Sequence, residues 1–571
     1  MADDPTSPAA TTPKPDDLRN WAAVVTQAQQ AMLDAGLAAA AAPGVPVVPG
    51  LNDPATLERA GAFWRDGLKL WQGLLDPAAA PEPVTDKRFK APEWRQPAFD
   101  HIRRGYQLMA DHLLAHVDAA PDLDPKHRER LRFAARGFVD AVSPSNFLLT
   151  NPQAIERTIA TGGENLVKGM RNLLDDLAAG QLTHTDPTAF EVGRNLATTP
   201  GQVVLRTPLF ELIQYAPTTT DVLATPLVIF PPWINRFYIL DLTPEKSFIR
   251  WAVEQGLTVF MVSWKSADAS MADIVWDDYV AAQTQAIDTV RAALDVPAVH
   301  TIGYCVAGTT LAATLAVLAA KGEADKVASA TFFTAQVDFA GAGELSHFID
   351  DDQLATIASL SPDGFLDGRY MALTFNLLRG RDLIWNYVTN NYLLGEDYTA
   401  FDLLHWNGDT TNLPAAWHRS YLTDLYRDNL LVEAGRLTVA GTPLDLTRVE
   451  TPSYVQAGRE DHIAPAASVW RLTHLFKGPI RFVLAGSGHI AGVVNPPAAG
   501  KYQYWTNDAA PSTLDEFVAG ATETKGSWWP DWIGWLHNRD AAEVSAMGAR
   551  VPGDGSLPAL GPAPGEYVRQ R

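Results

Sequence analysis

The chain has 571 residues, of which 47% are hydrophobic, and this is enough for one large domain with an insertion or for two domains. A formal net charge of −21 argues against a nucleic acid as a partner. Cys305 is the single cysteine, which excludes an intramolecular disulfide and any zinc site with several cysteine ligands.

The N-terminus carries no targeting signal of a secreted protein. Residues 1–5 are acidic and are not followed by the basic region and apolar core of a signal peptide. The most apolar runs, such as Leu311 to Ala320, are too short to span a bilayer. We therefore expect a soluble cytoplasmic protein with no membrane span. No Walker loop and no metal-binding histidine pair on a helix is visible, and neither a cofactor nor a metal ion is expected.

The N-terminal third is predicted to be helical. Residues 1–18 are rich in Pro, Ala, Thr and Asp and are expected to form a disordered tail. Residues 19–195 are expected to form a helical domain, with one helix beginning at Pro54. The apolar side chains of that helix either face a core or dock on an apolar surface. They are Leu57, Phe63, Trp64, Leu68, Trp71, Leu74 and Leu75.

Residues 196–571 are predicted to form a catalytic α/β domain, because predicted strands alternate with predicted helices. The alternation predicts a mostly parallel sheet covered by helices. It breaks down between about 340 and 445, a stretch long enough to be an inserted lid. The predicted strands are 226–230, 257–264, 299–302, 329–333, 453–457 and 481–485.

A cysteine stands where this pattern places a nucleophile. Residues 303–310 read Gly-Tyr-Cys-Val-Ala-Gly-Thr-Thr, after an apolar strand and before a helix. Strand, tight small-residue turn and helix form the nucleophile elbow of the α/β-hydrolase fold. The elbow would expose the Cys305 thiol at the top of the sheet and point to acyl transfer through a thioester. The alternative is a small buried hydrophobic cysteine.

A thiol nucleophile needs a base, and the base needs an orienting acid. In this fold the chain order is nucleophile, acid, histidine. Asp461 and His489 follow two late strands in that order. Glu460 is a rival acid and His462 a rival base, and we favour Asp461 and His489 by position.

Two backbone N–H groups are needed to stabilise an oxyanion. One is expected from Val306, the residue after the nucleophile. The other is expected from the loop after the strand at 226–230, where Pro231 and Pro232 have no N–H. Trp233 or Ile234 must then donate, unless the loop is only a rigid turn.

Several long strings resemble the polyhydroxyalkanoate synthases, especially the single-subunit short-chain type called class I. The likeness covers about residues 85 to 571, and the first 85 residues match poorly. Ala307 stands where many members have Gly, and Arg381 where the family more often has Asn. The strings are 151–169, 230–242, the elbow, 401–414, 458–465, 488–497, 526–535 and 563–568.

The resemblance implies a triad of Cys305, Asp461 and His489, with Ile234 and Val306 as oxyanion donors. It implies that a (3R)-hydroxyacyl-CoA, with 3-hydroxybutyryl-CoA the expected substrate, is polymerised into polyester. CoA would be released through a covalent acyl-cysteine intermediate. It also implies a cytoplasmic homodimer that associates with the growing polyester chain and with granules.

Three questions stay open at this level. The aromatic residues Phe401, Trp406 and Tyr421 either line an acyl pocket or simply pack the lid. Asp461 either orients His489 or helps to activate the attacking hydroxyl. The same triad also suits a cysteine hydrolase that lets water in, and a granule-coat protein could keep the fold without activity.

Overall fold

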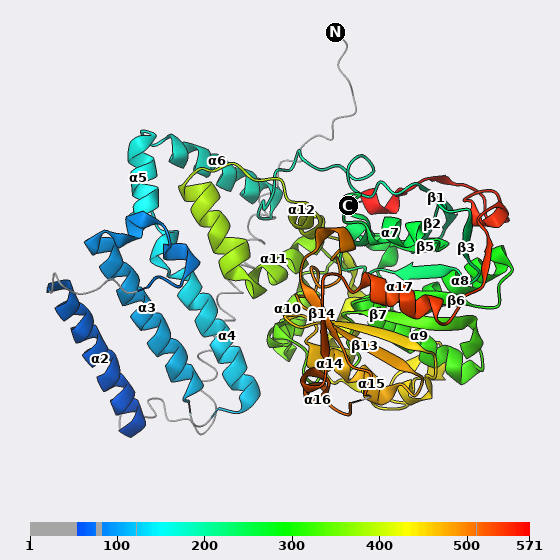
Figure 1. The fold of residues 1–571 in the computed structure, drawn as a ribbon. Coiled ribbons are helices and arrows are strands. Elements are labelled where there is room, and N and C mark those ends of the chain that lie inside the picture. Colours follow the sequence, from blue (N-terminus) through cyan, green and yellow to red (C-terminus); the bar gives the residue numbers. More distant parts are fainter. Residues whose placement is uncertain (1–53, 76–82, 121–122, 510, 571) are drawn as a thin grey trace, which may run out of the picture. The chain divides into compact units, whose positions relative to one another are not determined.

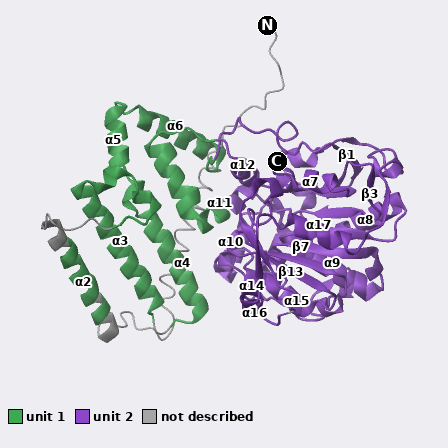
Figure 2. Ribbon diagram, viewed as in Figure 1, with its two compact units in different colours: residues 1–184, 373–399 green, residues 185–372, 400–571 purple. Residues whose placement is uncertain are grey.

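The computed structural model describes residues 54–75, 83–120, 123–509 and 511–570. Figure 2 shows two compact units: unit 1 is Met1–His184 with Leu373–Thr399, and unit 2 is Thr185–Ala372 with Ala400–Arg571. The sequence-based boundary lies at 195–196, eleven residues later than the boundary between the units. The middle of the expected lid, 373–399, belongs to unit 1. The expected tail at 1–18 lies outside the described residues.

Unit 1 is helical, and its helices begin where the sequence supplies caps. Pro occupies the first position of several helices, where its missing N–H costs nothing. Asp124 caps α4 by accepting from the N–H groups of Lys126 and His127, and Asn151 caps α5 in the same way. The helices are α2 (Pro54–Leu75), α3 (Pro97–Asp118), α4 (Pro125–Ala141), α5 (Pro152–Ala160) and α6 (Glu164–Ala179).

Residues 373–399 complete unit 1. They hold the end of α11 (Gly368–Leu378) and two π-helical segments, η8 (Arg381–Trp385) and η9 (Val388–Leu393). The Asn165 amide donates to the Leu393 carbonyl at 2.7 Å, and the Tyr392 hydroxyl donates to Asp176 at 2.5 Å. A side chain at Gly169 would overlap the Tyr392 carbonyl, so α6 and η9 pack closely. Three long-range contacts therefore bind the insertion to α6.

Unit 2 is built on an 11-stranded sheet in the order β15-β14-β13-β12-β7-β6-β4-β5-β2-β1-β17. The central strands from β5 to β13 are parallel, and the flanking strands are antiparallel. The parallel strands are β4 (Leu227–Phe230), β5 (Val259–Trp264), β6 (Val299–Tyr304), β7 (Val327–Phe333), β12 (Ser453–Gly458) and β13 (Ile480–Ala485). The antiparallel strands are β1 (Gly201–Arg206), β2 (Phe210–Tyr215), β14 (Gln503–Thr506), β15 (Thr522–Lys525) and β17 (Gly561–Pro562).

Helices cover both faces of this sheet (Figure 1). One core contains side chains of α8 (Trp276–Leu294) and α9 (Val306–Lys321), and the other contains those of α7 (Phe248–Glu254) and α17 (Trp529–His537). The central strands are buried on both sides, which explains their continuous apolar runs. The predicted α/β fold with a mostly parallel sheet and a helical N-terminal region is confirmed.

The segment between β7 and β12 interrupts the regular alternation. It contains α10 (Asp351–Ser359), α12 (Asp402–Gly408), α13 (Ala415–Ser420) and the π-helical η10 (Tyr421–Arg427). After β12 come α14 (Ala466–Trp470), α15 (Leu472–Leu475) and α16 (Leu514–Ala519). A short strand, β3 (Asp221–Leu223), pairs with β16 (Glu543–Ser545) apart from the main sheet. Within the described ranges, every helix is too short or too polar to cross a membrane.

Candidate active site

Cys305 lies at a sharp turn between β6 and α9. Its backbone has φ 52° and ψ −126°, a conformation that non-glycine residues adopt only under constraint. The Cys305 N–H donates to the Phe333 carbonyl at 2.9 Å, which ties the turn to the end of β7. A Cβ at Gly303 would lie 2.5 Å from the Cα of Gly308, so both positions must be glycine. The strand, turn and helix expected around Cys305 are therefore present.

A carboxylate and an imidazole meet at the same edge of the sheet. The His489 Nδ1 lies 2.7 Å from Asp461 Oδ2. The other carboxylate oxygen accepts from the N–H groups of Ile463 and Ala464, at 2.8 and 2.9 Å. Glu460 is exposed at the surface instead. Between the two carboxylates considered from the sequence, Asp461 is the one bonded to His489.

The electrostatics of His489 link it to both of its neighbours. Burial lowers the pKa of His489, but the charges of Asp461 and Cys305 and hydrogen bonds to both outweigh burial and raise it well above its usual value. The Tyr304 hydroxyl donates to the His489 carbonyl at 3.0 Å and fixes its backbone. The raised pKa favours a protonated imidazole at His489, next to the Cys305 sulfur.

The expected oxyanion donors come from two neighbouring strand ends. Val306 is the first residue of α9, a position whose N–H has no partner within the helix. Ile234 lies in the loop after β4, and β4 pairs with β6 in parallel so that Phe230 aligns with Gly303. The two chain segments therefore leave the sheet side by side, next to Cys305.

The loop that carries Ile234 is fixed by side chains. The Trp264 indole donates to the Pro231 carbonyl at 2.8 Å, and the Thr411 hydroxyl donates to the Trp233 carbonyl at 2.6 Å. The Trp233 ring stacks on Tyr279 with ring centroids 3.9 Å apart. Indoles and hydroxyls thus hold the loop backbone in one conformation.

The three predicted pocket aromatics have different surroundings. Trp406 is buried, and its indole N–H donates to the Arg236 carbonyl at 2.7 Å, which also supports the Ile234 loop. Phe401 is 44% exposed, and its N–H donates to the Thr185 hydroxyl. Tyr421 is partly buried, and burial, the neighbouring Tyr426 and the charge of Cys305 raise its pKa.

Tyr426 and Phe339, which were not predicted from the sequence, lie in and near η10 beside the predicted Tyr421. Burial and the charge of Cys305 also raise the pKa of Tyr426. The Phe339 ring packs against both Tyr421 and Tyr426, with centroids 6.1 and 4.7 Å away. The spacing of the two tyrosines, five residues, matches a π-helical turn and is the signal that could have added Tyr426 to the predicted Tyr421.

Known proteins match the chain along almost its whole length. A family model described as "Poly-beta-hydroxybutyrate polymerase (PhaC) N-terminus" matches residues 85–252, and one described as "alpha/beta hydrolase fold" matches residues 226–496. The poly(3-hydroxyalkanoate) polymerase subunit PhaC of Cupriavidus necator is 43% identical, over 99% of this chain and 97% of the relative.

The chain belongs to the poly(3-hydroxyalkanoate) polymerase family. A polymerase subunit of Rhizobium meliloti is 47% identical over 85% of this chain and 80% of the relative. A polymerase of Methylorubrum extorquens is 46% identical over 89% of this chain and 85% of the relative. The resemblance seen in the sequence strings is confirmed.

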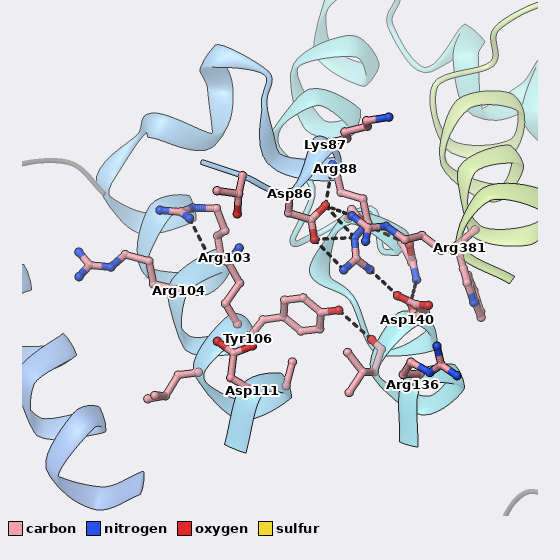
Figure 3. A pocket seen from close by; sticks show the side chains of 18 of the residues that line it. Asp86, Lys87, Arg88, Arg103, Arg104, Tyr106, Asp111, Arg136, Asp140 and Arg381 are labelled. Carbon is pink, nitrogen blue, oxygen red and sulfur yellow. Dashed lines mark hydrogen bonds and ion pairs between the residues drawn. The ribbon is translucent and has the colours of Figure 1, made fainter. Parts of the chain in front are cut away.

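This polymerase family member also has a large polar cleft within unit 1 (Figure 3). Its volume is about 1270 Å³, and α2, α3, α4 and the 381–390 segment line it. Arg88 pairs with Asp86 at 2.8 Å and with Asp140 at 3.1 Å, and Arg381 pairs with Asp86. Asp86 and Asp140 are therefore both neutralised by arginines that line the cleft with them. The network ties the 381–390 segment to the N-terminal part of unit 1 through the pair of Arg381 with Asp86.

Across the described ranges, no group of three His, Cys, Asp or Glu side chains is placed to hold a metal ion.

Proposed function

We propose that this protein polymerises (3R)-hydroxyacyl-CoA, with 3-hydroxybutyryl-CoA as the expected substrate, into polyhydroxyalkanoate and releases CoA. Membership of the polymerase family supports the reaction class. The observation that carries the mechanism is the thiol of Cys305 on a strained elbow beside the Asp461–His489 pair. Cys305 acts as nucleophile, His489 as base, and Asp461 as the acid that orients it.

The first half of the reaction loads the enzyme. His489 takes the thiol proton, and the Cys305 sulfur attacks the thioester carbonyl. The N–H groups of Val306 and Ile234 stabilise the negative oxygen of the tetrahedral intermediate. The bond to the CoA sulfur then breaks, and CoA leaves with the proton from His489. One thioester replaces another, so the acyl group stays activated.

The second half extends the polymer. The hydroxyl of another hydroxyacyl unit, or of the growing chain, attacks the acyl group on Cys305. His489 takes the hydroxyl proton and returns it to the sulfur as the carbon–sulfur bond breaks. An oxoester forms, and the free thiol is ready for the next unit. An ester is less activated than a thioester, so this step drives the cycle forward.

Water would compete with the hydroxyl for the acyl-enzyme, so the site must be dry. Tyr421, Tyr426 and Phe339 form a partly buried aromatic wall near Cys305 and suit an acyl pocket. Phe401 and Trp406 are proposed members of the same pocket, with Trp406 acting through the Arg236 carbonyl.

We also propose that unit 1 contacts the polyester product at the granule surface. Val167, Met170 and Leu174 repeat at helical spacing on α6 and are 57, 55 and 56% exposed. A row of exposed apolar side chains suits contact with an apolar solid such as a polyester. The polyester that would contact this row on α6 is the product of the proposed reaction.

The runner-up function is a cysteine hydrolase with the same triad. Incubation with (R)-3-hydroxybutyryl-CoA separates the two, because polymerisation gives an insoluble polyester and hydrolysis gives free 3-hydroxybutyrate. We expect released CoA to be matched by ester-linked hydroxybutyrate in polymer. Free acid equal to the released CoA would contradict the proposal and favour a hydrolase.

A further inference from the structure

The last residues of the chain fold back onto the loop that carries Ile234. After β17 pairs with β1, residues 563–570 run along unit 2, coloured red in Figure 1, and reach the region of α12. Glu211 on β2 is fully buried and accepts from the N–H groups of Glu566 and Tyr567, at 2.9 and 3.0 Å. The Tyr567 hydroxyl donates to the Thr207 carbonyl at 2.7 Å. The tail is thus anchored to the sheet along its length.

Arg236 receives the end of this tail. Its side chain is 1% exposed, and its guanidinium donates to the Gln570 carbonyl at 2.6 Å and to the Tyr567 carbonyl at 3.3 Å. It also donates to the Thr410 carbonyl at 3.3 Å and lies 3.6 Å from the Asp409 carboxylate. A planar guanidinium can bridge several acceptors at fixed angles, whereas an ammonium cannot.

Arg236 stands two residues after Ile234 in the same loop. Its own carbonyl accepts from the Trp406 indole, and the Trp233 carbonyl accepts from Thr411. The backbone on both sides of Ile234 is therefore held by α12 and the residues that follow it. The C-terminal tail holds the Arg236 side chain from the other end. The Arg236 guanidinium is therefore a direct link between the tail and the loop.

We propose that the C-terminal tail, residues 563–570, acts through Arg236 to position the Ile234 N–H for the oxyanion. Arg236 and the tail are then positioning elements of the reaction and do not touch the substrate. The inference rests on the proposed function, in which Ile234 donates to the tetrahedral intermediate. It predicts that loss of the tail contact damages acylation of Cys305 by a thioester but not the reactivity of the thiol itself.

Two reactions of the same sulfur separate these effects. Acylation by a thioester passes through an oxyanion and needs the Ile234 N–H. Alkylation by iodoacetamide displaces iodide at carbon and forms no oxyanion, but it needs the same thiolate. Cys305 is the only cysteine in the chain, so both rates report on one atom. The ratio of acylation rate to alkylation rate therefore measures the oxyanion hole.

The tail contact can be broken from either side. Arg236→Lys keeps the positive charge beside Asp409 but loses the paired hydrogen bonds of the guanidinium to the Tyr567 and Gln570 carbonyls. A chain that ends at Pro562 removes the carbonyls and leaves Arg236. We expect each change to lower the acylation rate about 10- to 100-fold, as for a displaced oxyanion donor, with the alkylation rate within about twofold of the unmodified protein. The double variant should be no slower than the slower single variant.

Arg550→Lys is the matched control. Arg550 is also a buried arginine, and it donates to the Ala224 carbonyl at 2.6 Å and to the Thr258 hydroxyl at 3.1 Å. These acceptors precede β4 and β5, so they lie at the sheet edge opposite Cys305. The same substitution there should leave the acylation-to-alkylation ratio unchanged.

The proposal is overturned if Arg236→Lys slows acylation and alkylation equally, or if it leaves both rates unchanged. It is also overturned if the effects of Arg236→Lys and of the chain that ends at Pro562 on the acylation rate are additive. A ratio that falls as much in Arg550→Lys would also overturn it, because the effect would then be general loosening. If the truncated chain does not fold, the Arg236→Lys and Arg550→Lys pair decides the matter. An unmodified protein that is alkylated but never acylated would instead refute the proposed function itself.

Discussion

The hydrogen bonds of Asp461 determine how an amide at this position would interact with His489. One oxygen accepts from two backbone N–H groups, and the other accepts from His489. An amide in place of the carboxylate would keep its oxygen on the backbone donors and turn its NH₂ toward His489. That orientation favours the wrong imidazole tautomer.

We predict that Asp461→Asn still forms the acyl-enzyme but stalls at elongation. A cysteine next to a histidine can be acylated without help from a carboxylate, so this step depends less on Asp461. An alcohol has a far higher pKa than a thiol, so its attack depends more on a competent base. Rapid-quench assays should show a burst of CoA close to one per active site, with little polymer. Glu460→Gln is the control and should polymerise normally.

Three secondary-structure elements hold the strained turn at Cys305 in place. Positive φ at a cysteine persists because β6, β7 and α9 determine the backbone together: Cys305 bonds to the end of β7, and Gly303 touches Gly308. This turn is predictable from the sequence because both glycines and the flanking apolar runs lie within a short stretch of the chain. The strand ends that carry Asp461 and His489 were predictable for the same reason.

A second element, the 3-10 helix η4 (Phe237–Asp241), carries a buried carboxylate with a pH-dependent cost. Burial raises the pKa of Asp241 to about 6, although the Thr199 and Ser247 hydroxyls both donate to it at 2.6 Å. A carboxyl whose folded-state pKa is raised adds stability at pH below about 4, and that stability is lost as the pH rises through about 6. Asp241→Asn removes the titration and keeps an oxygen that can accept from both hydroxyls.

We predict that the free energy of unfolding of the native protein falls by about 2 kcal/mol relative to Asp241→Asn between pH 4 and pH 7. Urea unfolding of both proteins at pH 4, 5, 6 and 7 measures this difference. A difference that stays constant across the range would show that Asp241 does not titrate as described.

At the scale of the whole molecule, the exposed apolar row on α6 bears on where the protein works. We predict that changing Val167, Met170 and Leu174 together to Ser reduces sedimentation with poly(3-hydroxybutyrate) particles at least severalfold, because apolar area drives such adsorption. CoA release from soluble substrate should be retained. The matched control changes Val518 and Met547 to Ser, two exposed apolar residues of unit 2. Equal sedimentation of both variants would contradict a specific role for α6.

Sequence reasoning was strongest where local patterns carry the structure and weakest where distant segments meet. The parallel strands of unit 2 and the helices of unit 1 follow from periodicity, capping residues and glycines. The membership of 373–399 in unit 1 rests on long-range pairs such as Asn165 with Leu393, which no local pattern encodes. The contact of Arg236 with Gln570 joins residues 334 positions apart, and it could not be predicted from the sequence for the same reason. Tyr421 was named from the sequence as a pocket residue, whereas its η10 neighbour Tyr426 was missed because π-helical spacing is rare.

The central claim is that Cys305 carries the acyl group, and trapping that intermediate tests it most directly. The protein is mixed with (R)-3-hydroxybutyryl-CoA and quenched in acid, and the peptide that contains Cys305 is analysed by mass spectrometry. We predict one hydroxybutyryl group on Cys305, formed as CoA is released, and no CoA above background from a folded Cys305→Ala protein. CoA release by Cys305→Ala, or an acyl group on any other residue, would contradict it.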